Sequence, residues 1–253
     1  MPNPADLFTL KGRVALVTGA SGGLGRRAAT VLAQAGASVV GVARRAEQLK
    51  DWQAETGGAT AALAADLSDR SALKDIAVAA AQPFGAPDIL VNAAGITTRE
   101  GSDEITAEGW DITMNLHLAA PFFLAQALVP AMRSQGWGRI LNFASLQSYR
   151  AFPGGLSYGA SKGGVAQMTR AMAQSWSGDG ITANAIGPGF FRTELTAPVF
   201  ADPDRAARNA AATCIGRNGE VEDIDGPVLF LCSDAGGYVT GQVLMVDGGF
   251  TAK

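Results

Sequence analysis

The stretch RVALVTGASGGLG, residues 13–25, decides the fold of this chain of 253 residues. Its first six residues form a short apolar run with β-branched side chains, which is typical of a buried strand. The remainder, TGASGGLG (18–25), places glycines where that strand turns into a helix expected over 24–35. A strand, a glycine-rich turn and a helix N-terminus in this order favour phosphate binding. Taken alone, the turn also fits an ordinary tight connection.

The same alternation of strand and helix continues along the chain. Further strands are expected at 38–43, 59–65, 88–93, 138–144, 181–186 and 242–247, and helices at 69–82, 108–134, 159–177 and 221–233. This alternation predicts a parallel sheet covered on both faces. We therefore expect an α/β, doubly wound Rossmann-type fold of about seven parallel strands in a single domain, 1–253. Ligands should bind outside the carboxyl ends of the strands.

Composition narrows the range of partners. The net charge is -3 and no basic run occurs, so we expect neither nucleic acid nor an anionic membrane as a partner. No apolar run reaches membrane-spanning length, and the N-terminus does not resemble a secretion signal. Cys214 and Cys232 are the only cysteines, which favours reduced thiols and a cytoplasmic location. We expect no metal site, because His117 is the single histidine.

The glycines of the first turn have separate predicted tasks. Gly19 allows the tight turn, Gly23 allows close approach to a pyrophosphate, and Gly25 lets the helix pack on the sheet. Ser21 and Leu24, in the same turn, are expected to contact the nucleotide as well.

The end of the second strand indicates which dinucleotide binds. A carboxylate there would bind the ribose 2′-hydroxyl of NAD, but this chain has Ala43, Arg44 and Arg45. A guanidinium suits a 2′-phosphate, so NADP(H) is preferred and NAD(H) is possible. We expect Arg44 to bind it and leave Arg45 open. Gly22 weakens this prediction because a second basic residue is missing there, and both arginines could be solvated loop charges.

The next two strand ends are expected to contact the adenosine. Asp66, followed by Leu67, offers an acceptor for the adenine amino group, although capping the next helix is an alternative role. In NAAG, we expect Asn92, Ala93 and Gly95 to contact the cofactor, because small residues there would let the ribose lie on the backbone. Close packing of strand on helix is the alternative for this motif.

Tyr158 and Lys162 lie four residues apart in a helical segment and so share one face. A neighbouring ammonium favours the phenolate, so we expect the pKa of Tyr158 below the usual value of about 10. That would make Tyr158 a general acid/base. Ser145, at a strand end, could hold the substrate oxygen, and Asn115 could hold a water next to Lys162.

The motifs TGASGGLG, NAAG, YGASK and GPGFFRTEL, with Asn115 and Ser145 between them, together resemble the short-chain dehydrogenase/reductase family over the whole chain. The resemblance implies a Ser145, Tyr158, Lys162 and Asn115 tetrad, and a Pro188–Gly189 segment over the nicotinamide. Phe191 and Thr193 would contact the cofactor there. Two departures, Ala93 and Gly187, lie outside the tetrad. The resemblance also implies a homotetramer built through helices 108–134 and 157–179 and the C-terminal strand.

The stretches LFTLKGR, ITTRE, SLQS and GQVLMVDGGF resemble the gluconate 5-dehydrogenase and deoxygluconate dehydrogenase branch. In that branch Arg99 matches an arginine suited to a sugar-acid carboxylate. Gln147 could bind a hydroxyl, and Arg150 and Arg192 are further candidates, although Arg99 also fits a surface charge. The implied function is hydride transfer between NADP(H) and a CH–OH group of a small molecule, a sugar acid or polyol.

A substrate lid is expected near 190–212, and its apolar residues keep a second function open. Phe190, Phe191, Pro198, Val199 and Phe200 would also suit an NADPH-dependent carbonyl reductase or a 3-oxoacyl ketoreductase. A third hypothesis, a nucleotide-sensing protein without turnover, is disfavoured because such a protein has no need of the tetrad.

Overall fold

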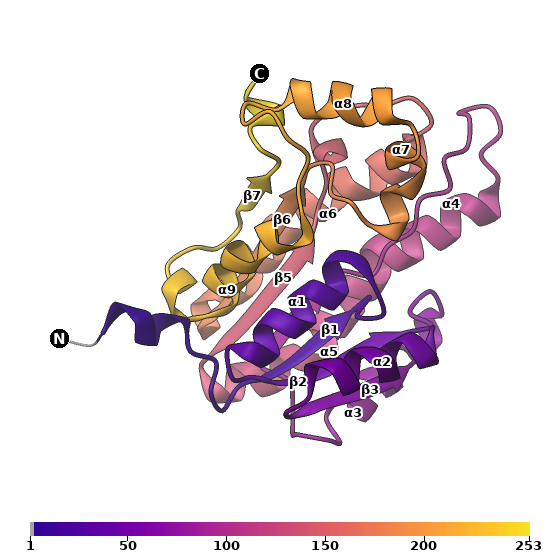
Figure 1. Ribbon diagram of the computed structural model, residues 1–253. Helices are drawn as coiled ribbons and strands as arrows, with labels where there is room; N and C mark the ends of the chain where they lie inside the picture. The colour runs from indigo at the N-terminus through magenta and orange to yellow at the C-terminus, as the bar shows by residue number, and fades with distance from the viewer. Residues whose placement is uncertain (1–2) are drawn as a thin grey trace.

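The computed structural model describes residues 3–253 and contains a parallel sheet in the order β3-β2-β1-β4-β5-β6-β7 (Figure 1). The strands are β1 Val14–Thr18, β2 Ser38–Ala43, β3 Thr60–Ala64, β4 Ile89–Asn92, β5 Gly138–Phe143, β6 Ile181–Pro188 and β7 Val243–Val246. Each strand expected from the sequence is present, within two residues at either end. The predicted doubly wound fold is confirmed.

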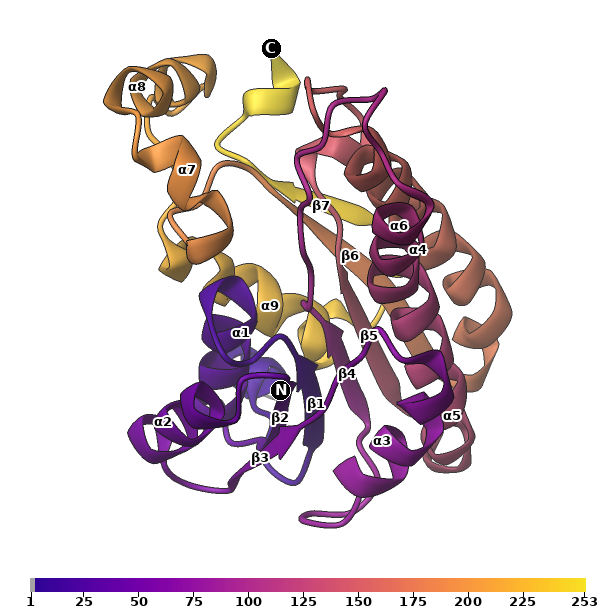
Figure 2. The same cartoon turned by 90° about the vertical axis from the view of Figure 1, so that its right-hand side faces the viewer.

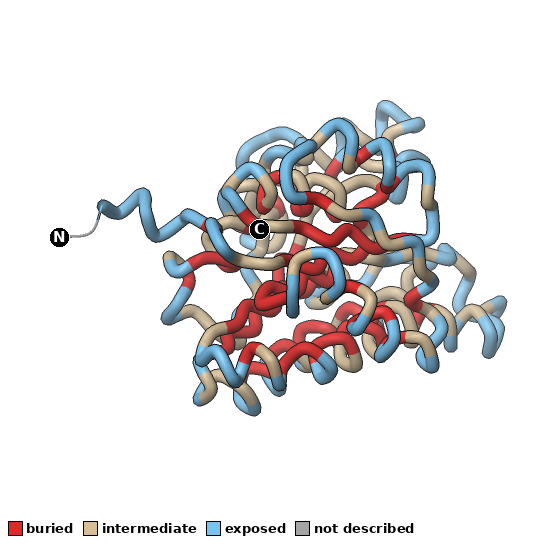
Figure 3. Tube along the Cα trace, turned by 90° about the horizontal axis from the view of Figure 1, so that it is seen from below, coloured by how far each residue is buried: buried red, intermediate tan, exposed pale blue. Residues whose placement is uncertain are grey.

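Helices cover both faces of the sheet (Figure 2). On one side lie α1 Gly23–Gln34, α2 Ala46–Thr56 and α9 Asp225–Cys232, whose apolar side chains share one core cluster with β1 and β2. On the other side lie α3 Leu73–Ala80, α4 Ala107–Met114, α5 Ala120–Gln135 and α6 Leu156–Trp176. In Figure 3 the buried trace runs through the strands between these layers. The two layers leave the strand ends as the accessible edges.

The topology places a crevice at the carboxyl ends of β1 and β4. After β1 the chain builds outward through β2 and β3, then crosses back so that β4 pairs with β1 on its other side. Thr18 and Asn92 are register partners, so both strands end at one level. Loops from neighbouring strands diverge at such a reversal and open a ligand site.

Three segments differ from expectation. Helix α2 was not expected, because it is mostly polar and buries only Leu49 and Trp52. The single helix expected at 108–134 is interrupted by a π-helical segment, Asn115–Ala119. The expected lid holds two short helices, α7 Ala197–Phe200 and α8 Pro203–Ala212, above the carboxyl ends of the strands (Figure 2).

The run Ala107–Gln135 is long and apolar enough, by length and composition, to cross a membrane. Its Leu124, Leu128 and Met132 side chains instead pack in a core cluster with residues of β1, β4 and α3. The core therefore accounts for the apolar composition of this run.

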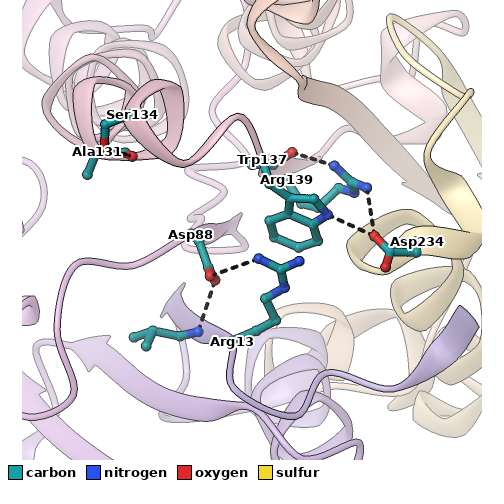
Figure 4. A network of polar contacts seen from close by, with 9 residues as sticks. Arg13, Asp88, Ala131, Ser134, Trp137, Arg139 and Asp234 are labelled. Carbon is teal, nitrogen blue, oxygen red and sulfur yellow. Dashed lines mark hydrogen bonds and ion pairs between the residues drawn. The ribbon is translucent and has the colours of Figure 1, made fainter. Parts of the chain in front are cut away.

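A charged cluster closes the opposite, amino edge of the sheet (Figure 4). The Trp137 ring lies 3.5 Å from the guanidinium carbon of Arg13 and 4.2 Å from that of Arg139. Asp88 accepts from the Val14 backbone N–H at 2.9 Å and pairs with Arg13 at 3.5 Å. Burial raises the pKa of Asp88 and lowers the pKa of Arg139. The cluster ties β1, β4 and β5 together away from the crevice.

Candidate active site

A cavity of about 1060 Å³ occupies the crevice. Nearly all residues predicted as site residues line it: Gly19, Ser21, Gly23, Leu24, Gly25, Arg44, Asp66, Leu67, Ala93, Gly95, Arg99, Ser145, Gln147, Tyr158, Lys162, Pro188, Gly189, Phe191 and Thr193. Asn92 and Asn115 are not among the lining residues. The predicted nucleotide end and the predicted reactive end therefore belong to one continuous space.

The glycine-rich turn has the tasks expected of it at two positions. Gly19 has a φ of 74°, and a Cβ there would lie 2.9 Å from the Ala93 backbone. A Cβ on Gly25 would lie 2.4 Å from the carbonyl oxygen of Gly19, so only glycine lets α1 approach β1 this closely. The first turn of α1 contains no acidic residue. This leaves the positive end of the helix available to a phosphate group.

The two arginines after β2 take different positions. Arg44 is exposed at the cavity edge, close enough to Asp66 for its charge to contribute to the lowered pKa of that carboxyl. Arg45 crosses the glycine-rich turn, donating to Ser21 Oγ at 3.2 and 3.1 Å and to Glu194 Oε2 at 2.7 Å. Both guanidinium groups line the cavity, so the donor set fits a 2′-phosphate. The sequence prediction missed Glu194, which is 149 residues from Arg45.

Asp66 and Asn92 make contacts that their sequence context did not reveal. Asp66 Oδ1 accepts from both the backbone N–H and the hydroxyl of Ser68, at 2.9 and 2.7 Å. These hydrogen bonds are the main cause of its lowered pKa. Asn92 donates to Asn142 Oδ1 at 2.9 Å, between β4 and β5. Asn92 thus joins two strands, while its neighbours Ala93 and Gly95 face the cavity.

The predicted acid/base pair is present, but the electrostatics differ from the expectation. The Lys162 ammonium donates to the Phe143 carbonyl at 2.6 Å and lies 5.6 Å from the Tyr158 ring centroid. Burial lowers the pKa of Lys162 to about 8. Burial also raises the pKa of Tyr158, and hydrogen bonding with Ser145 acts in the opposite direction. The expected lowering of the Tyr158 pKa was therefore wrong for the protein alone, because desolvation outweighs the hydrogen bond with Ser145.

Ser145 lies beside the phenol because β5 ends just before it. Its hydroxyl accepts from the Gln147 backbone N–H at 3.1 Å and caps the short helix Leu146–Ser148. Ser148 in turn donates to the Lys162 carbonyl at 2.7 Å, which ties this helix to α6. The Gln147 side-chain oxygen is buried without a hydrogen-bond partner among the described residues. It is therefore available to a polar ligand.

Asn115 begins the π-helical segment, and its carbonyl accepts from the Ala120 backbone N–H. Single π turns inside α-helices are frequent at functional sites. That Asn115 holds a water beside Lys162 stays a prediction.

The arginines at the substrate end are not the set expected. Arg99 lines the cavity with φ 53° and donates to the Leu195 carbonyl at 2.8 Å. Arg150 instead donates to the backbone near the C-terminus, and Arg192 stacks on Phe200 at 4.6 Å. Neither of these two lines the cavity, whereas Arg205 and Arg208 of α8 do. The sequence analysis missed this pair because it did not predict α8, where spacing of three residues places both on one face.

The lid presents only part of the expected apolar set to the cavity. Phe190, Phe191 and Val199 line the cavity, although Phe191 is only 3% exposed, whereas Pro198 and Phe200 do not line it. Phe190 packs edge-to-face on Phe152 and Phe250. Asn209 of α8 also lines the cavity, with a buried amide nitrogen that has no partner among the described residues.

Metal-binding side chains do not gather in this site. Within residues 3–253 no group of three or more His, Cys, Asp or Glu side chains could hold a metal ion.

Known proteins are similar to this chain in sequence and fold over nearly their full length. The family profile described as enoyl-(acyl carrier protein) reductase matches residues 19–251. The chain is 42% identical to gluconate 5-dehydrogenase of Gluconobacter oxydans, over 98% of both chains. It is 40% identical to 2-dehydro-3-deoxy-D-gluconate 5-dehydrogenase of Dickeya dadantii, over 98% of this chain and 99% of that one.

A solved structure gives the same result in three dimensions. It is a gluconate 5-dehydrogenase from Burkholderia cenocepacia in complex with NADP and tartrate, 36% identical, with a TM-score of 0.93. The alignment covers 99% of this chain and 100% of that one. With the Tyr158–Lys162 pair and the glycine-rich turn around one cavity, these matches show that the chain belongs to the short-chain dehydrogenase/reductase family.

Proposed function

We propose that this protein is an NADP(H)-dependent oxidoreductase that acts on a secondary alcohol or ketone of a sugar acid. The observation that carries the proposal is that Ser145, Tyr158 and Lys162 share one cavity with the glycine-rich turn. A nucleotide site and an acid/base group in one space fit hydride transfer coupled to proton transfer.

The protein's own residues would carry the proton and orient the substrate. In oxidation, the Tyr158 oxygen takes the alcohol proton while the Ser145 hydroxyl holds the same substrate oxygen. The Lys162 ammonium, positioned by the Phe143 carbonyl, stabilises negative charge on the phenol. Asn115 is proposed to hold a water that passes the proton on from Lys162. When bound, the nicotinamide nucleotide accepts or supplies the hydride.

The preference for NADP(H) rests on Arg44 and Arg45. Both arginines line the cavity, and Arg45 donates to Ser21 of the glycine-rich turn. The related enzyme from Burkholderia cenocepacia contains NADP. NAD(H) remains possible because Arg45 also pairs with Glu194.

The sugar-acid substrate rests on charge. Arg99, Arg205 and Arg208 line the cavity, and a guanidinium can donate two parallel hydrogen bonds to a carboxylate. The two relatives named above are dehydrogenases of gluconate and of a deoxygluconate derivative. The Phe152, Phe190 and Phe250 cluster favours a second candidate, a carbonyl reductase for more apolar ketones or a 3-oxoacyl substrate.

A substrate panel separates these candidates. We would follow nicotinamide reduction with NADP⁺ and NAD⁺, using five- and six-carbon aldonates, their deoxy forms and the matching neutral polyols. Turnover of an aldonate but not its polyol supports the carboxylate site. No turnover of any sugar, together with NADPH oxidation in the presence of aryl or alkyl ketones, would favour the second candidate over the sugar-acid dehydrogenase.

We also propose that the protein is a cytoplasmic homotetramer. Support comes from its family and from apolar side chains left exposed, among them Leu244 on the edge strand β7 at 38% and Leu156 on α6 at 48%. Light scattering coupled to gel filtration measures the number of subunits directly.

A further inference from the structure

We infer that His117 is a positioning residue that connects the loop after β4, where the cofactor is predicted to bind, to the backbone of Tyr158. It is the chain's single histidine, it is 1% exposed, and it lies in the π-helical segment two residues after Asn115. The inference rests on the hydride-transfer function proposed above.

The hydrogen bonds of His117 fix its protonation state. The Ile96 backbone N–H donates to Nε2 at 3.0 Å, so Nε2 carries no proton. Burial and the nearby Lys162 charge lower the pKa of His117 well below its ordinary value, so the ring is neutral. Nδ1 therefore carries the proton and donates to Ser161 Oγ at 2.8 Å. Ser161 in turn donates to the Tyr158 carbonyl at 2.7 Å.

These contacts join two elements that line the cavity from different sides. Ile96 and its neighbour Gly95 belong to the loop after β4, and a Cβ on Gly95 would lie 3.2 Å from His117 Nε2. The ring also meets Tyr158 edge-to-face, with 5.4 Å between ring centroids and planes at 90°. The His117 side chain thus sets the distance between the loop predicted to contact the ribose and the phenol of Tyr158.

The chain of hydrogen bonds ends at a backbone carbonyl, so it has no exit for a proton. His117 is therefore a positioning residue, whose two faces have separable effects. Its acceptor face, toward Ile96, should govern nucleotide affinity. Its donor face, toward Ser161, should govern the alignment of Tyr158 and hence turnover.

Two amide substitutions separate the faces. In His117→Asn the amide nitrogen takes the place of Nδ1, which keeps the donor to Ser161 and leaves the Ile96 N–H without an acceptor. We expect the Kd for NADPH, from fluorescence titration, to rise about tenfold because a buried donor is unsatisfied. In His117→Gln the side-chain oxygen takes the place of Nε2, which keeps that acceptor and removes the donor. We expect kcat with gluconate and NADP⁺ to fall about tenfold, with Kd nearly unchanged.

Two further measurements keep the test decisive. Ser161→Ala should reproduce the kcat loss of His117→Gln without changing Kd. Ultraviolet titration of tyrosinate, with Tyr158→Phe as the reference, should show a shifted Tyr158 pKa in His117→Gln and an unshifted one in His117→Asn. Neither this titration nor NADPH binding needs a substrate, so both decide the inference even if gluconate is not turned over. The inference would be overturned if the two amide variants changed Kd, kcat and the Tyr158 pKa equally, in proportion to a lowered Tm.

Discussion

We expect Glu194 to compete with the 2′-phosphate of NADP(H) for the guanidinium of Arg45. In the protein alone, Arg45 Nη1 is 2.7 Å from Glu194 Oε2, and its other nitrogens donate to Ser21. A 2′-phosphate that recruits Arg45 must therefore displace Glu194. Glu194→Gln should bind NADPH more tightly, and Arg45→Gln should bind it less tightly.

The structure sets the size of both effects. The side chains of Arg45 and Glu194 are 43% and 70% exposed, so the ion pair is screened and contributes at most about 1 kcal/mol. Its removal should tighten NADPH binding by about 1.5- to 5-fold. A hydrogen bond to a charged group contributes about 1.5–3 kcal/mol, so Arg45→Gln should weaken NADPH binding roughly 10- to 100-fold.

Fluorescence titration with NADPH and NADH checks this account. NADH lacks the 2′-phosphate, so its Kd should stay within about twofold in both variants. Added salt should reduce the gain in Glu194→Gln, because the ion pair it removes is exposed. Parallel changes in NADPH and NADH affinity, or an Arg45→Gln variant that binds NADPH like the unsubstituted protein, would refute the reasoning.

Three further outcomes follow from the described contacts. The pKa of Lys162 is lowered to about 8 in the folded protein, so between pH 8 and 10 the unfolded chain binds more protons at this residue and the stability rises with pH. The Tm of Lys162→Met should therefore fall further below that of the unsubstituted protein as the pH rises through this window. A Tm difference that stays constant would contradict this. Trp137→Ala should lower the free energy of unfolding, measured by urea denaturation, by about 2–3 kcal/mol, because it removes the ring between two guanidinium groups. The affinity for NADPH should not change. A loss below about 0.5 kcal/mol would disprove the contribution of the ring. Arg208→Gln should raise the KM for an aldonate about tenfold with kcat nearly constant, because Arg208 lines the cavity. Substitution of the exposed Arg170 by Gln serves as the control. An unchanged KM in Arg208→Gln would show that Arg208 does not bind the carboxylate.

Strand positions were predictable because a parallel sheet buries continuous apolar runs, and residues that follow such strands meet at one edge. Thr18, Ala93 and Ser145 are placed by that rule alone. Side chains that depend on distant segments were not predictable. Arg45 meets Glu194 only because the lid folds back over the glycine-rich turn.

Two other differences have a similar physical origin. Helix α8 has no buried residues and its apolar face consists of alanines, so no stripe of large apolar side chains marks it in the sequence and Arg208 went unnoticed. The pKa of Tyr158 depends on how completely it is desolvated, which sequence spacing with Lys162 does not report.

The central claim is that Tyr158 transfers the substrate proton in a nicotinamide-dependent oxidation. The direct measurement is the rate of NADPH formation from NADP⁺ and gluconate by the unsubstituted protein and by Tyr158→Phe, together with the Kd of each for NADPH. The account predicts that turnover falls by about 10³-fold or more in Tyr158→Phe while Kd changes little, because only the phenolic oxygen is lost. Near-normal turnover by Tyr158→Phe would contradict it.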